Sequence, residues 1–317
     1  MIHHHMSNST IRKKVNQIRQ LINNPQKHYE LRQNKALFSQ LCSSLDVIED
    51  TEDAISAYTE KDFGEDKPSH YLAVYGLLQA IYVQQDAVIN LCESLGIKDK
   101  VNNYPKLKEI REIRNDAVGH PTHRDQQKGK PVSYHHISQI TLNKSGFTLA
   151  SYFSDGSQVQ FRDIKIPELI FEQSKFISDI LTTLINNLEE EEKAHKEKFR
   201  MEKLLEIFSG TSDYQIEKLF EGISRGDCAK LADGALDSVI GEVNQFREAI
   251  KHRNMDFYER LQDKYELIEH ATTELRKYYR GDTVVEKPTA RIYVIFLKHQ
   301  IDELKAYAKE IDDEYAK

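Results

Sequence analysis

Two side chains suited to phosphate chemistry stand close together in the first half of the chain, Arg114 and His120. Histidine exchanges protons near neutral pH, and the arginine fork donates two parallel hydrogen bonds to phosphate while it stays charged. Cleavage of RNA by its own 2′-hydroxyl needs a proton-transfer group and a cation where negative charge grows. The pair therefore has the residue types that this kind of phosphate chemistry needs.

Arg114 and His120 can point to the same site only if the helix that carries Arg114 ends before His120. On an unbroken helix, six positions turn through about 600°, so the two side chains would point about 120° apart. Gly119 is a natural helix terminator, and Pro121 drives the preceding residue away from helical backbone angles. We expect a helix that starts near Pro105 and runs through residues 106–118, after which the chain turns the His120 ring towards Arg114.

The stretch from Tyr104 to Arg124 resembles the signature of HEPN domains, in which an arginine, commonly followed by a polar residue, precedes a histidine by a few positions. Here Arg114 is followed by Asn115, and five residues separate it from His120. The resemblance extends over roughly residues 10–205. It implies a helical bundle with the motif at a helix end.

The resemblance also implies a function. HEPN ribonucleases cleave RNA without a metal, and two protomers bring their motifs together across a homodimer interface. Arg114 and His120 would then be catalytic, and Asn115 would orient the phosphate or support the histidine. A role as a toxin or in antiviral defence is implied as well. Two alternatives stay open: a non-catalytic HEPN-like module that binds RNA or protein, and a scaffold in which residues 213–317 bind another protein.

Each motif residue also has a structural interpretation. Arg114 could form an ion pair with an acidic residue of its own helix, and the nearby candidates are Glu109, Glu112 and Asp116. His120 could be a helix C-terminal histidine that interacts with the helix dipole. Asn115 could simply face solvent.

Cationic residues follow the motif. The predicted RNA-binding residues are His123, Arg124, Lys128 and Lys130, and the rings of Tyr134, His135 and His136 could stack on bases. A solvated loop is the alternative for this segment. The neighbouring histidines lack acidic or cysteine partners at a zinc-ligand spacing, so no metal or cofactor is expected.

The hydrophobic periodicity predicts a mostly α-helical fold: an HEPN-like bundle with a small antiparallel β-meander inserted near residues 134–166, followed by a C-terminal helical bundle. Predicted helices cover residues 10–23, 30–60, 68–95, 106–118, 167–188 and onward, 213–224, 227–254, 255–280 and 288–316. Predicted strands cover residues 137–142, 147–153 and 158–166.

The 317-residue chain is long enough for two domains, and its net charge of −7 does not exclude a local basic patch. We interpret residues 1–6, which include three histidines, as a tag. The polar segment 209–213 is the predicted boundary between an HEPN-like domain at 7–208 and an accessory domain at 213–317. The apolar run Ile292–Leu297 should be mostly buried and is too short to cross a membrane. Three scattered cysteines fit a reducing cytoplasm.

Overall fold

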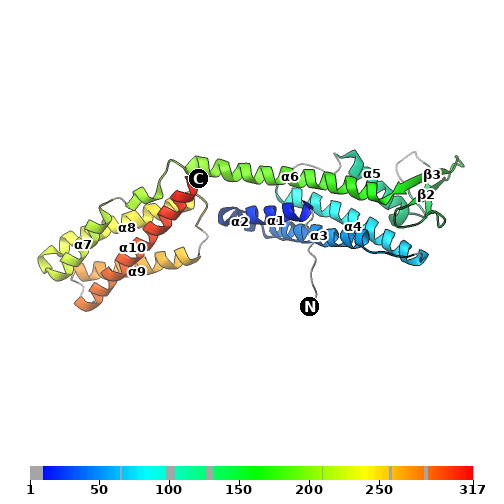
Figure 1. Cartoon of the computed structure of the whole chain (residues 1–317). Coiled ribbons are helices and arrows are strands. Elements are labelled where there is room, and N and C mark those ends of the chain that lie inside the picture. The colour runs from blue at the N-terminus through cyan, green and yellow to red at the C-terminus, as the bar shows by residue number, and fades with distance from the viewer. Residues whose placement is uncertain are drawn as a thin grey trace. The chain divides into compact units, whose positions relative to one another are not determined.

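The computed structural model describes residues 10–64, 66–97, 104–125, 131–208, 210–256, 259–281 and 285–316, so the predicted tag lies outside the described residues. The prediction of a mostly α-helical chain with a small antiparallel sheet is confirmed (Figure 1). The chain forms two compact units. The first ends at Glu189, and the second begins at Glu190 and also includes His28–Glu30.

Helices make up most of the first unit. They are α1 (Thr10–Ile22), α2 (Pro25–Arg32), α3 (Lys35–Glu60), α4 (Lys67–Ser94), α5 (Pro105–Arg114) and α6 (Ile166–Phe199), of which α6 continues into the second unit. The single helix predicted over residues 30–60 is wrong. Asn34 ends that continuity because its side chain accepts a hydrogen bond from the Leu37 N–H at 3.2 Å and caps the start of α3.

The apolar stripe predicted on the third helix does form the centre of the first core. Val74, Leu78 and Ile81 of α4 are fully buried, and α3 lies alongside α4 in Figure 1. Polar groups join the helices inside this core: Gln173 of α6 donates to Gln84 of α4 at 2.9 Å, and Gln84 donates to Glu52 of α3 at 2.7 Å. These directional bonds favour one packing arrangement, whereas apolar contacts alone are less specific.

The inserted sheet has the order β1 (Ser133–Ile137), β2 (Gly146–Phe153), β3 (Gln160–Lys165), with both pairs antiparallel. The first strand predicted at residues 137–142 is wrong, because the strand ends where the prediction began. Its core-facing positions are Ser133, His135 and Ile137. Two of these three are polar, so the strand lacks the hydrophobic alternation that would have revealed it.

The second unit contains the helices expected after the first domain. They are α7 (Ser212–Ser224), α8 (Ala229–His252), α9 (Glu259–Tyr279) and α10 (Lys287–Tyr315), preceded by the 3₁₀ turn η3 (Leu204–Phe208), with η4 (Gly226–Cys228) between α7 and α8. The boundary differs from the predicted segment 209–213. It lies inside α6, because Phe199 at the end of that helix already belongs to the second hydrophobic core.

The apolar run Ile292–Leu297 on α10 is only half buried, so the prediction for it is wrong. Val294 and Leu297 are fully buried, whereas Ile292 is 64% and Ile295 54% exposed. An α-helix turns successive side chains to different faces, so a continuous apolar run cannot be buried on one side alone. No helix in the described ranges is long and apolar enough to span a bilayer.

Candidate functional site

The motif lies at the end of α5, where the helix widens. Residues Asn115–Gly119 form a π turn, η2, which the His120 N–H closes by donating to the Asn115 carbonyl at 2.8 Å. The expected break therefore exists, but the chain stays helical through Gly119. His120 leaves the helix at φ −138° and ψ 50°. Single π turns inside helices are frequent at functional sites, because the extra residue changes the direction of the side chains that follow.

Arg114 is held by neutral groups. Its Nε and Nη2 both donate to the Gln79 side-chain oxygen of α4, at 3.2 and 2.7 Å, and its Nη1 donates to the Asn115 side-chain oxygen at 3.0 Å. The guanidinium carbon also lies 4.2 Å from the centre of the Tyr82 ring. These three bonds leave two of the five guanidinium N–H donors for a ligand. The half-buried arginine is thus fixed in place and still able to bind.

Gly119 provides the space for this arrangement. A β-carbon at position 119 would lie 2.6 Å from Nη1 of Arg114 and 3.4 Å from the Asn115 side-chain oxygen. Any side chain there would displace the guanidinium. The glycine predicted as a helix terminator therefore acts by its small size, because its backbone angle is not among the left-handed ones in the chain.

The acids near Arg114 are bound to other cations. Glu112 and Asp116 both form ion pairs with Arg124, and Glu109 binds Lys106 at 3.0 Å and also Arg162. The alternative that Arg114 forms an ion pair within its own helix is therefore wrong for every described carboxylate. Its positive charge is not neutralised by a neighbouring side chain, which is the electrostatic condition that an anion-binding arginine needs.

His120 is exposed, and its ring makes no hydrogen bond to any described residue. The structure brings Arg114 and Asn115 into direct contact and places His120 at the other end of the same π turn. It shows no bond between Arg114 and His120. The next histidine, His123, is exposed too, and its ring lies 6.5 Å from that of Tyr134 in an edge-on arrangement.

Arg124 is not a surface cation, so its predicted contact with RNA does not fit the structure. Only 8% of the residue is exposed, and it binds the side chains of Glu112 and Asp116 as well as the Glu112 carbonyl at 3.1 Å. A buried charge is tolerated when it is paired in this way. Arg124 therefore has a structural role, since it holds Glu112 and Asp116 of the motif helix in place. The other two predicted RNA-binding cations, Lys128 and Lys130, lie outside the described residues.

His135 is buried beside Asp116 as well. Its ring nitrogens lie 2.8 Å from the Ser151 hydroxyl and 2.9 Å from the Ser133 hydroxyl, and 3.3 Å separates Nε2 from Asp116. Burial, and to a lesser extent the charge of Arg124, lowers the pKa of His135 below its ordinary value. Because the ring is buried, it is not available to stack on a base as the sequence suggested.

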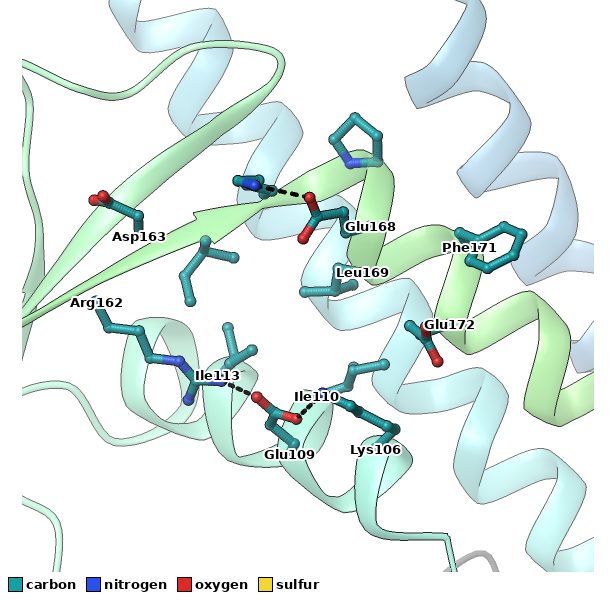
Figure 2. A pocket seen from close by; sticks show the side chains of 13 residues that line it. Lys106, Glu109, Ile110, Ile113, Arg162, Asp163, Glu168, Leu169, Phe171 and Glu172 are labelled. Carbon is teal, nitrogen blue, oxygen red and sulfur yellow. Dashed lines mark hydrogen bonds and ion pairs between the residues drawn. The ribbon is translucent and has the colours of Figure 1, made fainter.

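A cavity of about 490 Å³ lies beside the motif, between α5, β3 and the start of α6 (Figure 2). Its floor is apolar, with Ile110 and Leu169, and its rim carries charged side chains. Figure 2 shows Glu109 bound to Lys106 and Arg162 across the opening. Because these cations are paired and neither Arg114 nor His120 lines the cavity, we do not assign the phosphate chemistry to it.

Sequence reasoning missed the groups on α4 that fix Arg114. Gln79 and Tyr82 lie off the buried stripe of that helix and share no motif with Arg114, from which 35 positions separate Gln79. Their only signal is spacing. Leu72, Tyr75, Gln79 and Tyr82 recur at intervals of three and four, which places them on one helix face. That face is partly exposed although it begins with an apolar and an aromatic residue.

The arrangement can bind a phosphate at Arg114 and can move a proton at His120, which are separate capabilities of one π turn. Searches with protein-family models, and against curated proteins and solved structures, give no match.

Proposed function

We propose that the chain is an HEPN-like, metal-independent endoribonuclease that cleaves RNA by attack of the 2′-hydroxyl, in a cytoplasmic toxin or antiviral role. One observation carries the proposal: Arg114 keeps an unneutralised, immobilised charge while every acid near it on α5 and the π turn is bound to another cation. An arginine with a purely structural role would be expected to form an ion pair with one of those acids. An arginine that binds phosphate needs its positive charge to remain unpaired.

In the proposed reaction, His120 accepts the proton of the 2′-hydroxyl, and the resulting oxygen attacks the adjacent phosphorus. The two remaining Arg114 N–H groups donate to the non-bridging phosphate oxygens, where negative charge increases. The bond to the 5′-oxygen breaks, and that oxygen takes a proton. The products are a 2′,3′-cyclic phosphate and a 5′-hydroxyl. Asn115 acts as a positioning residue, since its side chain holds Nη1 of Arg114.

The proton for the leaving oxygen requires a second acid, which a second copy of the motif would supply in a homodimer. The exposed face of α4 supports such a dimer. Leu72 is 78% and Tyr75 41% exposed, on the same face as the Gln79 and Tyr82 side chains that hold Arg114. Apolar surface directly beside the motif is expected where two protomers meet.

A second candidate is a non-catalytic RNA-binding module, and the surroundings of His120 favour it. A general base is usually oriented by a third group, and no described residue forms a hydrogen bond with this ring. In that case, Arg114 would still bind phosphate, and RNA would be retained without being cut.

Incubation of the purified protein with total RNA in EDTA tests the proposal. We expect fragments with 2′,3′-cyclic phosphate ends from the wild type and none from His120→Ala or Arg114→Ala, because each removes one of the two required functions. Arg114→Lys should also be inactive, since a lysine has no planar fork. His299→Ala, an exposed histidine of the second unit, is the matched control and should cleave normally.

Circular dichroism shows whether the variants stay folded. Cleavage that survives in both alanine variants would refute the assignment of the site. Binding of RNA without cleavage by the wild type would establish the non-catalytic alternative.

A further inference from the structure

Four rings gather on the outer face of the sheet, and we call them the ring face: Tyr134 and His136 on β1, Tyr152 on β2 and Phe161 on β3. Side chains alternate along a strand, so the buried Ser133, His135 and Ile137 place Tyr134 and His136 on the opposite, outer side. Tyr134 is 39%, Tyr152 40% and Phe161 71% exposed. Partly exposed aromatic rings gathered on one sheet face are typical of a binding surface.

The register brings these rings together. Tyr134 pairs directly with Tyr152, while His136 and Phe161 both pair with Ala150 from its two sides. His136 and Tyr152 stack with ring centres 5.5 Å apart and planes 18° apart. Ala150 is on the same outer side and is only 1% exposed, so the surrounding side chains cover it. His136 and Tyr152 therefore form a stacked pair, and the register places Tyr134 and Phe161 on the strands to either side of Tyr152 and Ala150.

Strand β1, which carries two of the rings, is bonded to the segment that follows the motif. The His135 N–H of β1 donates to the Pro121 carbonyl at 2.6 Å, directly after His120, and Arg124 forms a β-bridge with Ser133. The exposed ring of His123 lies against Tyr134. The segment that directly follows His120 is thus tied to the strand that carries Tyr134 and His136.

We propose that the ring face is a base-stacking platform for single-stranded RNA, which holds the nucleotides next to the phosphate bound at Arg114. The proposal rests on the proposed function for its position, but it concerns binding and not cleavage. Rings select bases over aliphatic partners because each base has a π face of its own, and stacked bases must be unpaired. The charged residues on the outer side of β3 already have partners within the chain. Asp163 accepts a hydrogen bond from the Thr148 hydroxyl at 2.6 Å, and Lys165 pairs with Glu168 at 2.9 Å.

The platform makes a distinctive prediction about salt. Stacking releases no counterions, so loss of a ring should weaken binding at every salt concentration and leave the slope of log K against log salt unchanged. Loss of Arg114, in contrast, should reduce that slope by about one. The two contributions can therefore be separated in one titration series.

The experiment measures anisotropy of a fluorescent 12-nucleotide RNA bound to the full chain carrying His120→Ala, which keeps the probe intact. We expect Tyr152→Ala and Phe161→Ala each to weaken binding about tenfold, and Tyr152→Phe to bind as before because it keeps the ring. Phe171→Ala is the matched control, since Phe171 is 65% exposed on α6 of the same unit. The control should bind normally.

Equal binding by all variants, or an equal loss with Phe171→Ala, would overturn the platform. A loss of equal size for a duplex of the same sequence would also overturn it, because paired bases cannot stack on the rings. Normal platform behaviour in a wild-type protein that cuts no RNA would refute only the nuclease proposal.

Discussion

At the scale of single residues, the small size of Gly119 allows the Arg114 guanidinium to occupy the position from which we propose that it binds phosphate. Substitution by alanine places a methyl group 2.6 Å from Nη1, so the guanidinium must leave its position between Gln79 and Asn115. We expect Gly119→Ala to lower the rate of RNA cleavage roughly 10- to 100-fold, as loss of one charge-stabilising donor does. The free energy of unfolding should change by less than about 1 kcal/mol, because only a side chain moves.

Single-turnover cleavage together with thermal unfolding measures both effects. Gly241→Ala on α8 is the control, since nothing lies within 4 Å of its added β-carbon and neither quantity should fall. Full activity in Gly119→Ala would mean that the position of the guanidinium seen here is not the one that binds phosphate.

The candidate residues themselves could be named from the sequence, because an arginine and a histidine near a glycine are visible without a structure. Their surroundings could not. The sequence alternative paired Arg114 with Glu109, Glu112 or Asp116. In the structure, Arg124 binds Glu112 and Asp116, and Glu109 binds Lys106 and Arg162. Which of two nearby arginines pairs with an acid depends on burial, and Arg124 is the more buried of the two.

At the scale of elements, helix identity followed from periodicity more reliably than the ends of the helices. The apolar stripe of α4 and the helix end at Gly96, which has φ +70°, could be predicted from the sequence. The π turn was not, since it has no sequence signature and differs from an α-helix by one hydrogen-bond step. Strand β1 was misplaced because its buried positions carry Ser133 and His135, which bond to each other at 2.9 Å.

The exposed face of α4 leads to a prediction about assembly. Leu72→Glu should weaken the proposed homodimer at least about tenfold, because an unpaired carboxylate buried at the contact would cost about 1.4 kcal/mol or more. Light scattering over a concentration series measures this. Cleavage should decrease in parallel, since each composite site would lose its second motif.

The control for the dimer prediction is Leu231→Glu on α8, a leucine that is 66% exposed in the second unit. It should leave the oligomeric state unchanged. A wild-type protein that is monomeric at micromolar concentration would refute the dimer, and a dimer that persists in Leu72→Glu would place its interface on another surface.

At the scale of the whole molecule, the division inside α6 determines how the chain can be cut. A fragment that ends at Glu189 keeps the entire first core, which ends at Leu188. A fragment that ends at residue 208 also carries Phe199, Leu204 and Phe208, whose core partners would be missing. We expect the shorter fragment to be the better-behaved one and to retain RNA cleavage, because the exposed apolar residues of the longer one promote aggregation.

Size-exclusion chromatography and circular dichroism of the two fragments test this, with cleavage as the functional readout. Retained or increased cleavage by the shorter fragment would fit an accessory unit that controls the first or recruits a protein partner. Failure of that fragment to fold, with normal folding of the longer one, would contradict the division at Glu189.

The ion pairs of Arg124 with Glu112 and Asp116 constrain how the sequence can change. Replacement of Arg124 alone would leave Glu112 and Asp116 without their cation, and either acid could then turn to Arg114 and neutralise it. A substitution far from any ligand would thereby inactivate the site without touching it. In related chains, positions 112, 116 and 124 are accordingly expected to vary together, so that loss of the arginine is accompanied by loss of the acids. Such covariation would indicate that the positive charge of Arg114 has to remain unpaired for the protein to function.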